Sequence, residues 1–506
     1  MIQIKGFAVG QEHYQALNQI TERLARKDSS IWGTAAQAEA SIRLNWIDLP
    51  ESSRDLLPLL DALSAWSREL KHDNFVLCGM GGSSLAPEVI AATHGKKLTV
   101  LDSTDPEHVT EVLNQDLRNT CFIIGSKSGS TIETASQKIA AEQQLKKQGL
   151  NPVDHLVVVT DPGSPLDKQA KASGYRVINA DPNVGGRFSA LSAFGLTPAA
   201  LIGVDVSVLI DDAYAAALEF TKPDSSAVKV AAALATKEFT YFGIANNSKS
   251  LPGLGDWIEQ LIAESTGKDE KGVLPVVINT SANPLFPVIS FDGEGDYAVN
   301  GSLGEQFIFW EWVTAITSYL LKVDPFNQPN VTEAKEKTSS LLSRWSQSGM
   351  VMPTPVFATQ NVEVFADTQH GSSTDYLAES ISKADGYLAI MAYLHRGVNY
   401  EITELRDLLE VAAKKPTTFG WGPRFLHSTG QFHKGGPRLG SFIQITGHTN
   451  LTWPISGQSY GFESLILAQA LGDNETLLSR NFPTIRFHLK DRVLGIKELL
   501  QAARSL

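Results

Sequence analysis

The feature that most constrains the fold is a glycine-rich turn in residues 75–88, FVLCGMGGSSLAPE, between an apolar strand and an expected helix. Gly79, Gly81 and Gly82 carry no side chain, so the backbone can approach a ligand closely there. Two serines follow, and their hydroxyls and the N–H groups that begin a helix are donors suited to an anion such as phosphate. The segment therefore predicts an anion site at a strand-to-helix turn.

The same pattern recurs at residues 121–134, CFIIGSKSGSTIET, and two such turns indicate a phosphorylated substrate rather than a nucleotide. A dinucleotide-binding fingerprint is the competing interpretation of the first turn. It needs a third glycine where this chain has Ser84, and an acidic residue after the next strand, which Asp102 supplies. A tight turn without any ligand is the third interpretation, and the second turn makes it less favoured.

Strand-like runs alternate with helical patterns, such as ETASQKIAAEQQLKKQG, across the first third of the chain. This alternation, with short connections, predicts an α/β fold with a mostly parallel sheet covered by helices on both faces. Ligands of such sheets bind at the carboxyl ends of the strands, where both turns lie. The expected strands are 75–79, 97–102, 121–125, 155–160 and 175–179.

A second group of expected strands follows an alanine-rich helical segment at 227–243. It begins near GVLPVVIN at 272 and FPVISFDG at 286, and VEVFAD at 362–367 and GSFIQITG at 440–447 extend it. We therefore expect two α/β lobes.

The chain ends of this two-lobed fold are expected to be helical. The N-terminal segment includes the helical pattern QEHYQALNQITERLARK at 11–27, and the C-terminal tail ends in the helix GIKELLQAARSL. The lobe boundary is expected near 205–225. The expected domains are a helical segment at 1–72, a first lobe at 73–205, a second lobe at 206–450 and a tail at 451–506.

Composition excludes several classes of partner. A formal net charge of −12 over 506 residues argues against a basic surface for nucleic acid or anionic lipid. Cys78 and Cys121 fall inside expected core strands, so we expect buried thiols rather than a disulfide or a metal cluster. The N-terminus MIQIKGFAVGQEHYQ does not look like a signal peptide, and no apolar stretch reaches the roughly 18 residues of a membrane span. We expect a cytoplasmic protein without metal or cofactor.

A few charged residues and histidines are candidates for catalysis. Arg187 follows a glycine pair in DPNVGGRFSALSAFGL and could be a surface arginine or a fixed guanidinium that stabilises an oxyanion. Glu264 lies in AESTGKDEKGVLPV and Lys335 in FNQPNVTEAK. The commoner alternative for each is a solvated residue on the surface of a helix. His427 and His433 lie six positions apart, which is not the spacing of a helical zinc pair, so no metal site is expected there.

Read together, these segments resemble one family, phosphoglucose isomerase, which is built on the two-lobed sugar-isomerase (SIS) fold. The resemblance rests on CGMGGSSLAP, GSKSGSTIET, VGGRFSALSAFGL, ESTGK and PFNQPNVTEAK, which span residues 78–335. It is strongest to the isomerase half of bifunctional transaldolase–phosphoglucose isomerases, which TTFGWGPRFLHSTGQFHKGG and the tail also resemble. A transaldolase barrel needs about 250 residues, for which we expect no room, so the resemblance implies a stand-alone isomerase.

The resemblance implies reversible isomerisation of glucose 6-phosphate to fructose 6-phosphate (EC 5.3.1.9), a step of glycolysis and gluconeogenesis. Glu264 would move a proton between C2 and C1, and Arg187 would stabilise the enediolate without a metal. Lys335 and a histidine would move protons during ring opening. The substrate-binding positions of the family fall on Gly81, Gly82, Ser83, Ser84, Ser126, Lys127, Ser128, Ser130, Thr131, Gly186 and Gln328.

One departure concerns the ring-opening histidine. Family members carry it between the catalytic glutamate and the lysine, but residues 265–334 contain no histidine here. The best match comes later, at HSTGQF, which makes His427 the expected histidine and His433 the reserve. In the family this histidine comes from the neighbouring subunit, so the resemblance implies a homodimer.

Two other functions are possible on the same fold. A non-catalytic sugar-phosphate sensor would need the hydroxyl-rich turns but not Glu264, Arg187 and Lys335 together, so an enzyme is favoured. An isomerase of broader specificity, acting also on mannose 6-phosphate, would differ in the room around the C2 hydroxyl, and the sequence leaves this open.

Overall fold

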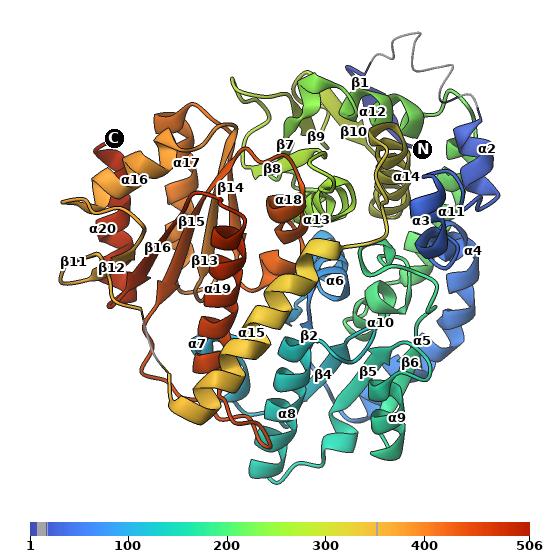
Figure 1. Ribbon diagram of the computed structural model, residues 1–506. Helices are drawn as coiled ribbons and strands as arrows, with labels where there is room; N and C mark the ends of the chain where they lie inside the picture. The colour runs from blue at the N-terminus through green and yellow to red at the C-terminus, as the bar shows by residue number, and fades with distance from the viewer. Residues whose placement is uncertain (8–16, 18, 351–352) are drawn as a thin grey trace. The chain divides into compact units, whose positions relative to one another are not determined.

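The computed structural model describes residues 1–7, 17, 19–350 and 353–506 (Figure 1). The chain forms two compact units, and each is an assembly of helices and mostly parallel strands, which is the α/β class that the sequence predicts. The first unit comprises Met1–Asp102 and Asn114–Gln328, and the second comprises Ser103–Leu113 and Pro329–Leu506.

The first sheet of the first unit has five parallel strands in the order β3-β2-β4-β5-β6. β4 and β5 are buried along their whole length, as is typical of a parallel sheet covered on both faces. Cys78 and Cys121 are free and buried in β2 and β4, as expected. All five expected strands are confirmed, as β2 (Asn74–Gly79), β3 (Thr99–Leu101), β4 (Thr120–Gly125), β5 (Leu156–Thr160) and β6 (Arg176–Asn179).

Each glycine-rich turn leads from a strand of this sheet into a helix. α6 (Leu85–Thr93) follows β2, and α8 (Ile132–Lys147) follows β4. β2 and β4 are neighbours, with Gly79 opposite Gly125, so both turns lie at the same carboxyl edge. The other helices of this part are α5 (Leu57–Glu69), α9 (Pro165–Ala172) and α10 (Ala193–Leu201).

The second sheet of the first unit has the order β1-β10-β9-β7-β8, with only β1 antiparallel to its neighbour. Its strands are β1 (Gln3–Lys5), β7 (Tyr241–Ala245), β8 (Leu274–Ile278), β9 (Val288–Ser290) and β10 (Tyr297–Asn300). Its helices are α11 (Val206–Phe220), α12 (Ser226–Leu234), α13 (Leu254–Thr266) and α14 (Leu303–Leu321).

The helical prediction for 227–243 is wrong at its end, because α12 stops at Leu234 and β7 begins at Tyr241. β7 lies between β8 and β9 and buries Phe242 and Ile244. Pairing in the middle of a sheet therefore prevails over the helical pattern of the preceding alanines.

The second unit contains one sheet, in the order β11-β12-β16-β15-β13-β14, in which β13 to β16 are parallel. The sequence grouped the strands at 362–367 and 440–447 with those near 272 and 286, but the structure pairs them in this separate sheet. The strands are β11 (Phe357–Ala358), β12 (Val362–Phe365), β13 (Tyr387–Tyr393), β14 (Thr417–Trp421), β15 (Gly440–Gly447) and β16 (Thr484–Leu489).

Helices cover both faces of this sheet. Ile443 and Ile445 of β15 face a core that includes residues of α16 (Ser373–Ser382), α17 (Glu404–Ala413) and α20 (Arg492–Arg504). Gln444 points the other way, and its Nε2 donates to the carbonyl of Ala470 at 2.9 Å. Ala470 lies in α19 (Phe462–Ser479), beside which α15 (Pro329–Ser348) runs in Figure 1. The unit also contains α7 (Pro106–Leu113) and α18 (Gly430–Gly435).

The two chain ends are mainly helical, as expected, with one strand each that the sequence did not reveal. The N-terminal segment contains α2 (Ile20–Ala25), α3 (Thr34–Ala40) and α4 (Leu49–Ser52) as well as β1, and the predicted helix at 11–27 lies partly outside the described residues. The C-terminal tail contributes β16, which pairs with β12 and β15.

The compact units divide the chain after Gln328, whereas the predicted lobe boundary near 205–225 falls between the two sheets of the first unit. The predicted domain bounds stay a prediction. Among the described residues, no helix is both long and apolar enough to cross a membrane.

Candidate functional site

The centre of the candidate site is an ion pair between Arg187 and Glu264. Arg187 lies on a short 3-10 turn (Gly186–Phe188), and Glu264 lies near the end of α13. Arg187 Nη1 is 3.0 Å from Glu264 Oε1, and the two residues are only 5% and 6% exposed. The surface alternatives that the sequence left open for these two residues are therefore wrong.

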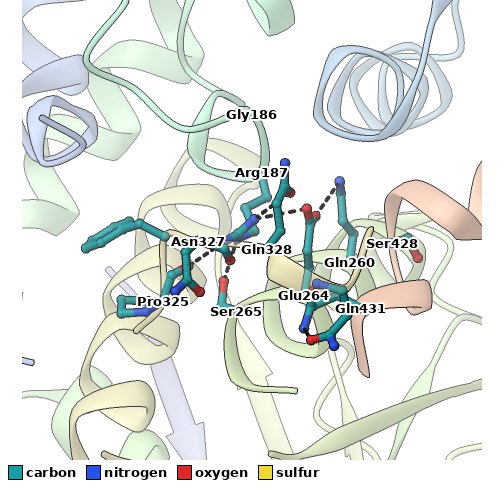
Figure 2. A network of polar contacts seen from close by, with 12 residues as sticks. Gly186, Arg187, Gln260, Glu264, Ser265, Pro325, Asn327, Gln328, Ser428 and Gln431 are labelled. Atoms are coloured by element: carbon teal, nitrogen blue, oxygen red, sulfur yellow. Dashed lines mark hydrogen bonds and ion pairs between the residues drawn. The ribbon is translucent and has the colours of Figure 1, made fainter. Parts of the chain in front are cut away.

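Arg187 is held by acceptors on every one of its nitrogens (Figure 2). Nε donates to Ser265 Oγ at 2.8 Å, and Nη1 donates to Gln328 Oε1 at 3.3 Å besides pairing with Glu264. Nη2 donates to the carbonyl oxygens of Pro325 and Asn327. Because a guanidinium has five donors in a fixed fork, this arrangement leaves Arg187 no freedom to reorient.

A second basic side chain, Lys268, binds the segment 324–328 to the same centre. Its Nζ donates to the carbonyl of Asp324, and the side chain is 2% exposed. Burial lowers the pKa of Lys268 well below its usual range, and the nearby Arg187 lowers it further, against the opposing effects of Asp324 and Glu264. Lys268 thus positions the segment that carries Gln328.

Sequence reasoning missed three residues of this centre: Gln260, Ser265 and Lys268. Gln260 Nε2 donates to Glu264 Oε2 at 3.1 Å. Its position four residues before Glu264, on the same face of a helix, was the available signal. Ser265 and Lys268 lie within the ESTGK segment itself.

The first glycine-rich turn packs directly against the turn that carries Arg187. A Cβ on Gly82 would lie 1.9 Å from the carbonyl oxygen of Gly186, so only glycine allows the approach. Ser84 is fully buried, and its Oγ donates to the carbonyl of Gly81 at 3.2 Å, whereas Ser83 is partly exposed. The predicted glycines therefore shape the site, and Ser83 is the serine of this turn that is open to a ligand.

The second turn gathers four hydroxyls at the N-terminus of α8. Ser126 Oγ donates to Thr131 Oγ1 at 3.4 Å, and Ser128 Oγ lies 2.7 Å from Ser130 Oγ. Thr131 precedes the helix without capping it through its side chain, and Ser128 and Ser130 are exposed. Hydroxyls and helix N–H groups are arranged here as an anion site requires.

Lys127 is predicted to bind the substrate, but its side-chain nitrogen already contacts other residues of the protein. Its Nζ is 2.7 Å from Asp161 Oδ2 and 3.0 Å from the carbonyl oxygen of Pro182. Burial lowers the pKa of Lys127, which Asp161 opposes. The contacts favour a role of Lys127 in fixing the turn over direct contact of its ammonium with a ligand.

Lys335, His427 and His433 belong to the second unit. Lys335 is exposed on α15, and His427 is partly buried on a 3-10 turn that follows β14. His433 is 3% exposed, and its Nδ1 lies 3.1 Å from the hydroxyl of Tyr387. Burial, with a further contribution from Lys434, lowers the pKa of His433 to about 3. Of the two histidines, His427 is therefore the better candidate for proton transfer.

The described residues contain no group of three or more His, Cys, Asp or Glu side chains placed to hold a metal ion. The arrangement consists instead of a buried carboxylate with a fixed guanidinium, and of a hydroxyl-rich anion site on the same sheet edge as the glycine turn that packs against Arg187. A carboxylate can move protons, and a fixed guanidinium can stabilise a developing negative charge.

Comparison with known proteins bears on the same part of the chain. Residues 66–285 match the phosphoglucose isomerase family. The phosphoglucose isomerase match contains both glycine-rich turns, Arg187 and Glu264, and it ends before Gln328. The resemblance found in the sequence is confirmed over this range.

Relatives named as glucose-6-phosphate isomerases match somewhat less than half of the chain. One protein of this name from Thermus thermophilus is 34% identical over 248 residues, which cover 47% of this chain and 59% of that protein. A probable glucose-6-phosphate isomerase from Haloarcula marismortui is 32% identical over 235 residues, which cover 43% of this chain and 54% of that protein. The chain thus spans little more than half the length of these relatives.

A solved structure supports the fold over a longer range. The crystal structure of a glucose-6-phosphate isomerase from Chlamydia trachomatis has a TM-score of 0.54 at 18% identity, over 68% of this chain and 89% of that chain. At this identity the likeness supports the phosphoglucose isomerase fold alone.

The depressed pKa of His433 predicts a ring that stays neutral between about pH 8 and 5. Below about pH 6.5 the unfolded chain takes up a proton at this residue that the folded chain does not, so His433 lowers the free energy of unfolding as the pH falls toward 3. NMR of labelled histidine side chains, assigned with His433→Gln, measures the titration. A His433 ring that protonates near pH 6.5 would contradict this assignment.

Proposed function

We propose that this chain catalyses the reversible isomerisation of glucose 6-phosphate and fructose 6-phosphate. The observation that carries the proposal is the buried pair of Arg187 and Glu264, 3.0 Å apart, inside the range that matches phosphoglucose isomerase. A sensor that only binds sugar phosphate has no use for a buried carboxylate base, so the enzyme is the favoured function.

Glu264 is the proposed base. It removes the proton from C2 of the open-chain aldose, which gives an enediolate. It then returns the proton to C1, while the proton of the C2 hydroxyl passes to O1, and the product is the ketose. Oε1 is occupied by Arg187, and Oε2 accepts from Gln260. A carboxylate oxygen has a second acceptor position, so Oε2 is the oxygen proposed to take the proton.

Arg187 is proposed to stabilise the negative charge of the enediolate. Its hydrogen bond to Gln328, at 3.3 Å, is the longest of its contacts. A substrate oxygen that replaced Gln328 Oε1 would meet a cation already oriented by Ser265 and the backbone of 325–327. This pre-orientation is what electrostatic stabilisation of a transition state requires.

The hydroxyl turn of Ser126, Ser128, Ser130 and Thr131 is the proposed phosphate site, and Ser83 is proposed to face the sugar. Ring opening is assigned to Lys335 and His427, as the family resemblance implies. We further propose that the protein acts in the cytoplasm as a homodimer, in which His427 serves the partner's site. The kinship with the bifunctional transaldolase fusions stays a prediction.

A coupled assay tests the proposal directly. Fructose 6-phosphate is supplied, and glucose 6-phosphate is read through a dehydrogenase. Turnover is expected, and the same assay started from mannose 6-phosphate measures the breadth of specificity. Binding of fructose 6-phosphate without any turnover would instead identify a sensor.

Glu264→Gln is expected to lower turnover by about 10²–10⁴-fold, because the base is lost. The amide keeps an oxygen for Arg187 to donate to, so the protein should fold and retain affinity for sugar phosphate. The control is Glu69→Gln, at an exposed glutamate at the end of α5, which should leave turnover unchanged. Near-normal turnover of Glu264→Gln would contradict the assignment of Glu264 as the base.

Ser128→Ala and Thr131→Ala should each weaken sugar-phosphate binding by about 1–3 kcal/mol, because each removes a hydrogen bond to a charged group. The measurements are the Kd of fructose 6-phosphate by calorimetry and the KM in the assay. Ser173→Ala, at an exposed serine after α9, is the control and should have no effect. Equal affinity for fructose and its 6-phosphate would rule out a phosphate site.

Mixing two inactive variants tests the dimer. If His427 serves the partner's site, a heterodimer of Glu264→Gln and His427→Ala contains one site with both native residues and one with neither. Random exchange makes about half of the dimers mixed, so recovery of up to about a quarter of the wild-type activity is expected. Absence of recovery after confirmed subunit exchange would place His427 in its own subunit's site or outside catalysis.

A further inference from the structure

The second unit contains a cavity of about 560 Å³ that the proposed reaction does not use. Its wall is formed by the later turns of α15, by α19, by the end of β12 and by the start of β16. The start of β16 lies at the amino edge of the parallel strands, whereas His427 follows the carboxyl end of β14. The cavity is therefore separate from His427, and Lys335, which lies nearer the start of α15, is not among the residues that line it.

Arg486 of β16 lines this cavity and is only 2% exposed. Its guanidinium carbon lies 3.7 Å from the centroid of the Phe365 ring, and Nη1 donates to Thr446 Oγ1 at 3.5 Å, a long hydrogen bond. Among the described residues no carboxylate oxygen lies within ion-pair distance of it, although Glu363 acts on it from farther away. Burial lowers the pKa of Arg486 to about 10, so the side chain remains charged at neutral pH.

Other buried cations of this unit have a carboxylate partner. Lys434 Nζ is 2.6 Å from Asp473, and Arg492 Nη2 is 2.8 Å from Asp105. A buried charge without a partner is costly, so natural proteins pair it or use it to bind a ligand. Arg486 differs from these two cations because it has no carboxylate partner in the described part of the chain, and it lies at the wall of a cavity.

The remaining walls suit the body of a small organic molecule. Leu341 and Trp345 of α15 and Leu471 of α19 supply apolar and aromatic surface, and Phe365 adds a ring beside the guanidinium. Arg344 lies at the exposed rim, where its Nη2 is 3.9 Å from Glu475. A volume of 560 Å³ is within the usual range of small-molecule sites.

We propose that this cavity is a second ligand site, which binds a small organic oxyanion. The phosphate or carboxylate head pairs with Arg486, whose planar fork of donors matches both groups, and the apolar body packs against Trp345 and Leu471. The site requires no metal and no chemical step. The proposal does not depend on the isomerase function of the first unit.

The test uses two probes, phenyl phosphate and benzoate, titrated into the full chain by calorimetry. We expect at least one probe to bind, and Arg486→Met to weaken that binding by about 10-fold or more, because the charged partner is lost. Arg504→Met, at an exposed arginine of α20 outside the cavity, should bind as the wild type does. Ser128→Ala reports separately on any probe that binds at the hydroxyl turn of the first unit.

A second variant keeps Arg486 and fills the cavity. Ser348→Trp, at an exposed position at the end of α15, adds a ring to the wall and should also weaken probe binding. Without a probe, Arg486→Met should melt at or above the wild-type temperature, because it removes a buried charge that has no carboxylate partner within the residues that the structure describes. No binding of either probe to the wild type, or weakening by Ser128→Ala but not by Arg486→Met, would overturn the proposal. A melting temperature of Arg486→Met far below that of the wild type, with no probe effect, would identify a structural arginine instead.

Discussion

The ion pair between Arg187 and Glu264 is the interaction on which the candidate site depends. It joins a turn after the first sheet to a helix of the second sheet, and Arg187 also holds Ser265 and the backbone of 325–327. Segments far apart in the sequence are thereby fixed around one guanidinium. A buried pair of this kind gains little net stability, but removal of one partner leaves an uncompensated charge. Its geometry is therefore maintained by the satisfied donors around it rather than by the pair alone.

The first unit contains two kinds of group that can bind a negative charge. At the centre, a guanidinium with all its nitrogens engaged provides a fixed cation next to a carboxylate. At the second turn, Ser126, Ser128 and Thr131 gather over the N-terminus of α8, where uncharged donors suit an anion. An acidic chain, with a net charge of −12, can thus bind a phosphorylated molecule without a basic surface. The close approach of Gly82 to Gly186 couples the glycine turn of this sheet edge to the turn of Arg187.

In the second unit, Arg486 is a buried cation that has no carboxylate partner among the described residues. Lys434 and Arg492 are buried with carboxylate partners, whereas Arg486 rests on an aromatic ring at a cavity wall. In many proteins, a ligand binds where a buried group lacks its usual partner, because the ligand then offsets the free-energy cost of burying that group. The contrast between the buried cations of one unit is the reason to treat this cavity as more than a packing defect.

The sequence by itself determined the first sheet, both glycine-rich turns and the residue types of the site. Strand–turn–helix patterns of this kind are local, and the apolar strands of a covered parallel sheet are readable from composition. It did not determine β7 or β16, because both owe their state to pairing between strands that are distant in the chain. Nor could it reveal that Lys127 is engaged by Asp161, that His433 is enclosed beside Tyr387, or that Lys268 holds the segment of Gln328. Burial and partners decide what a charged side chain can do, and only the tertiary structure supplies them.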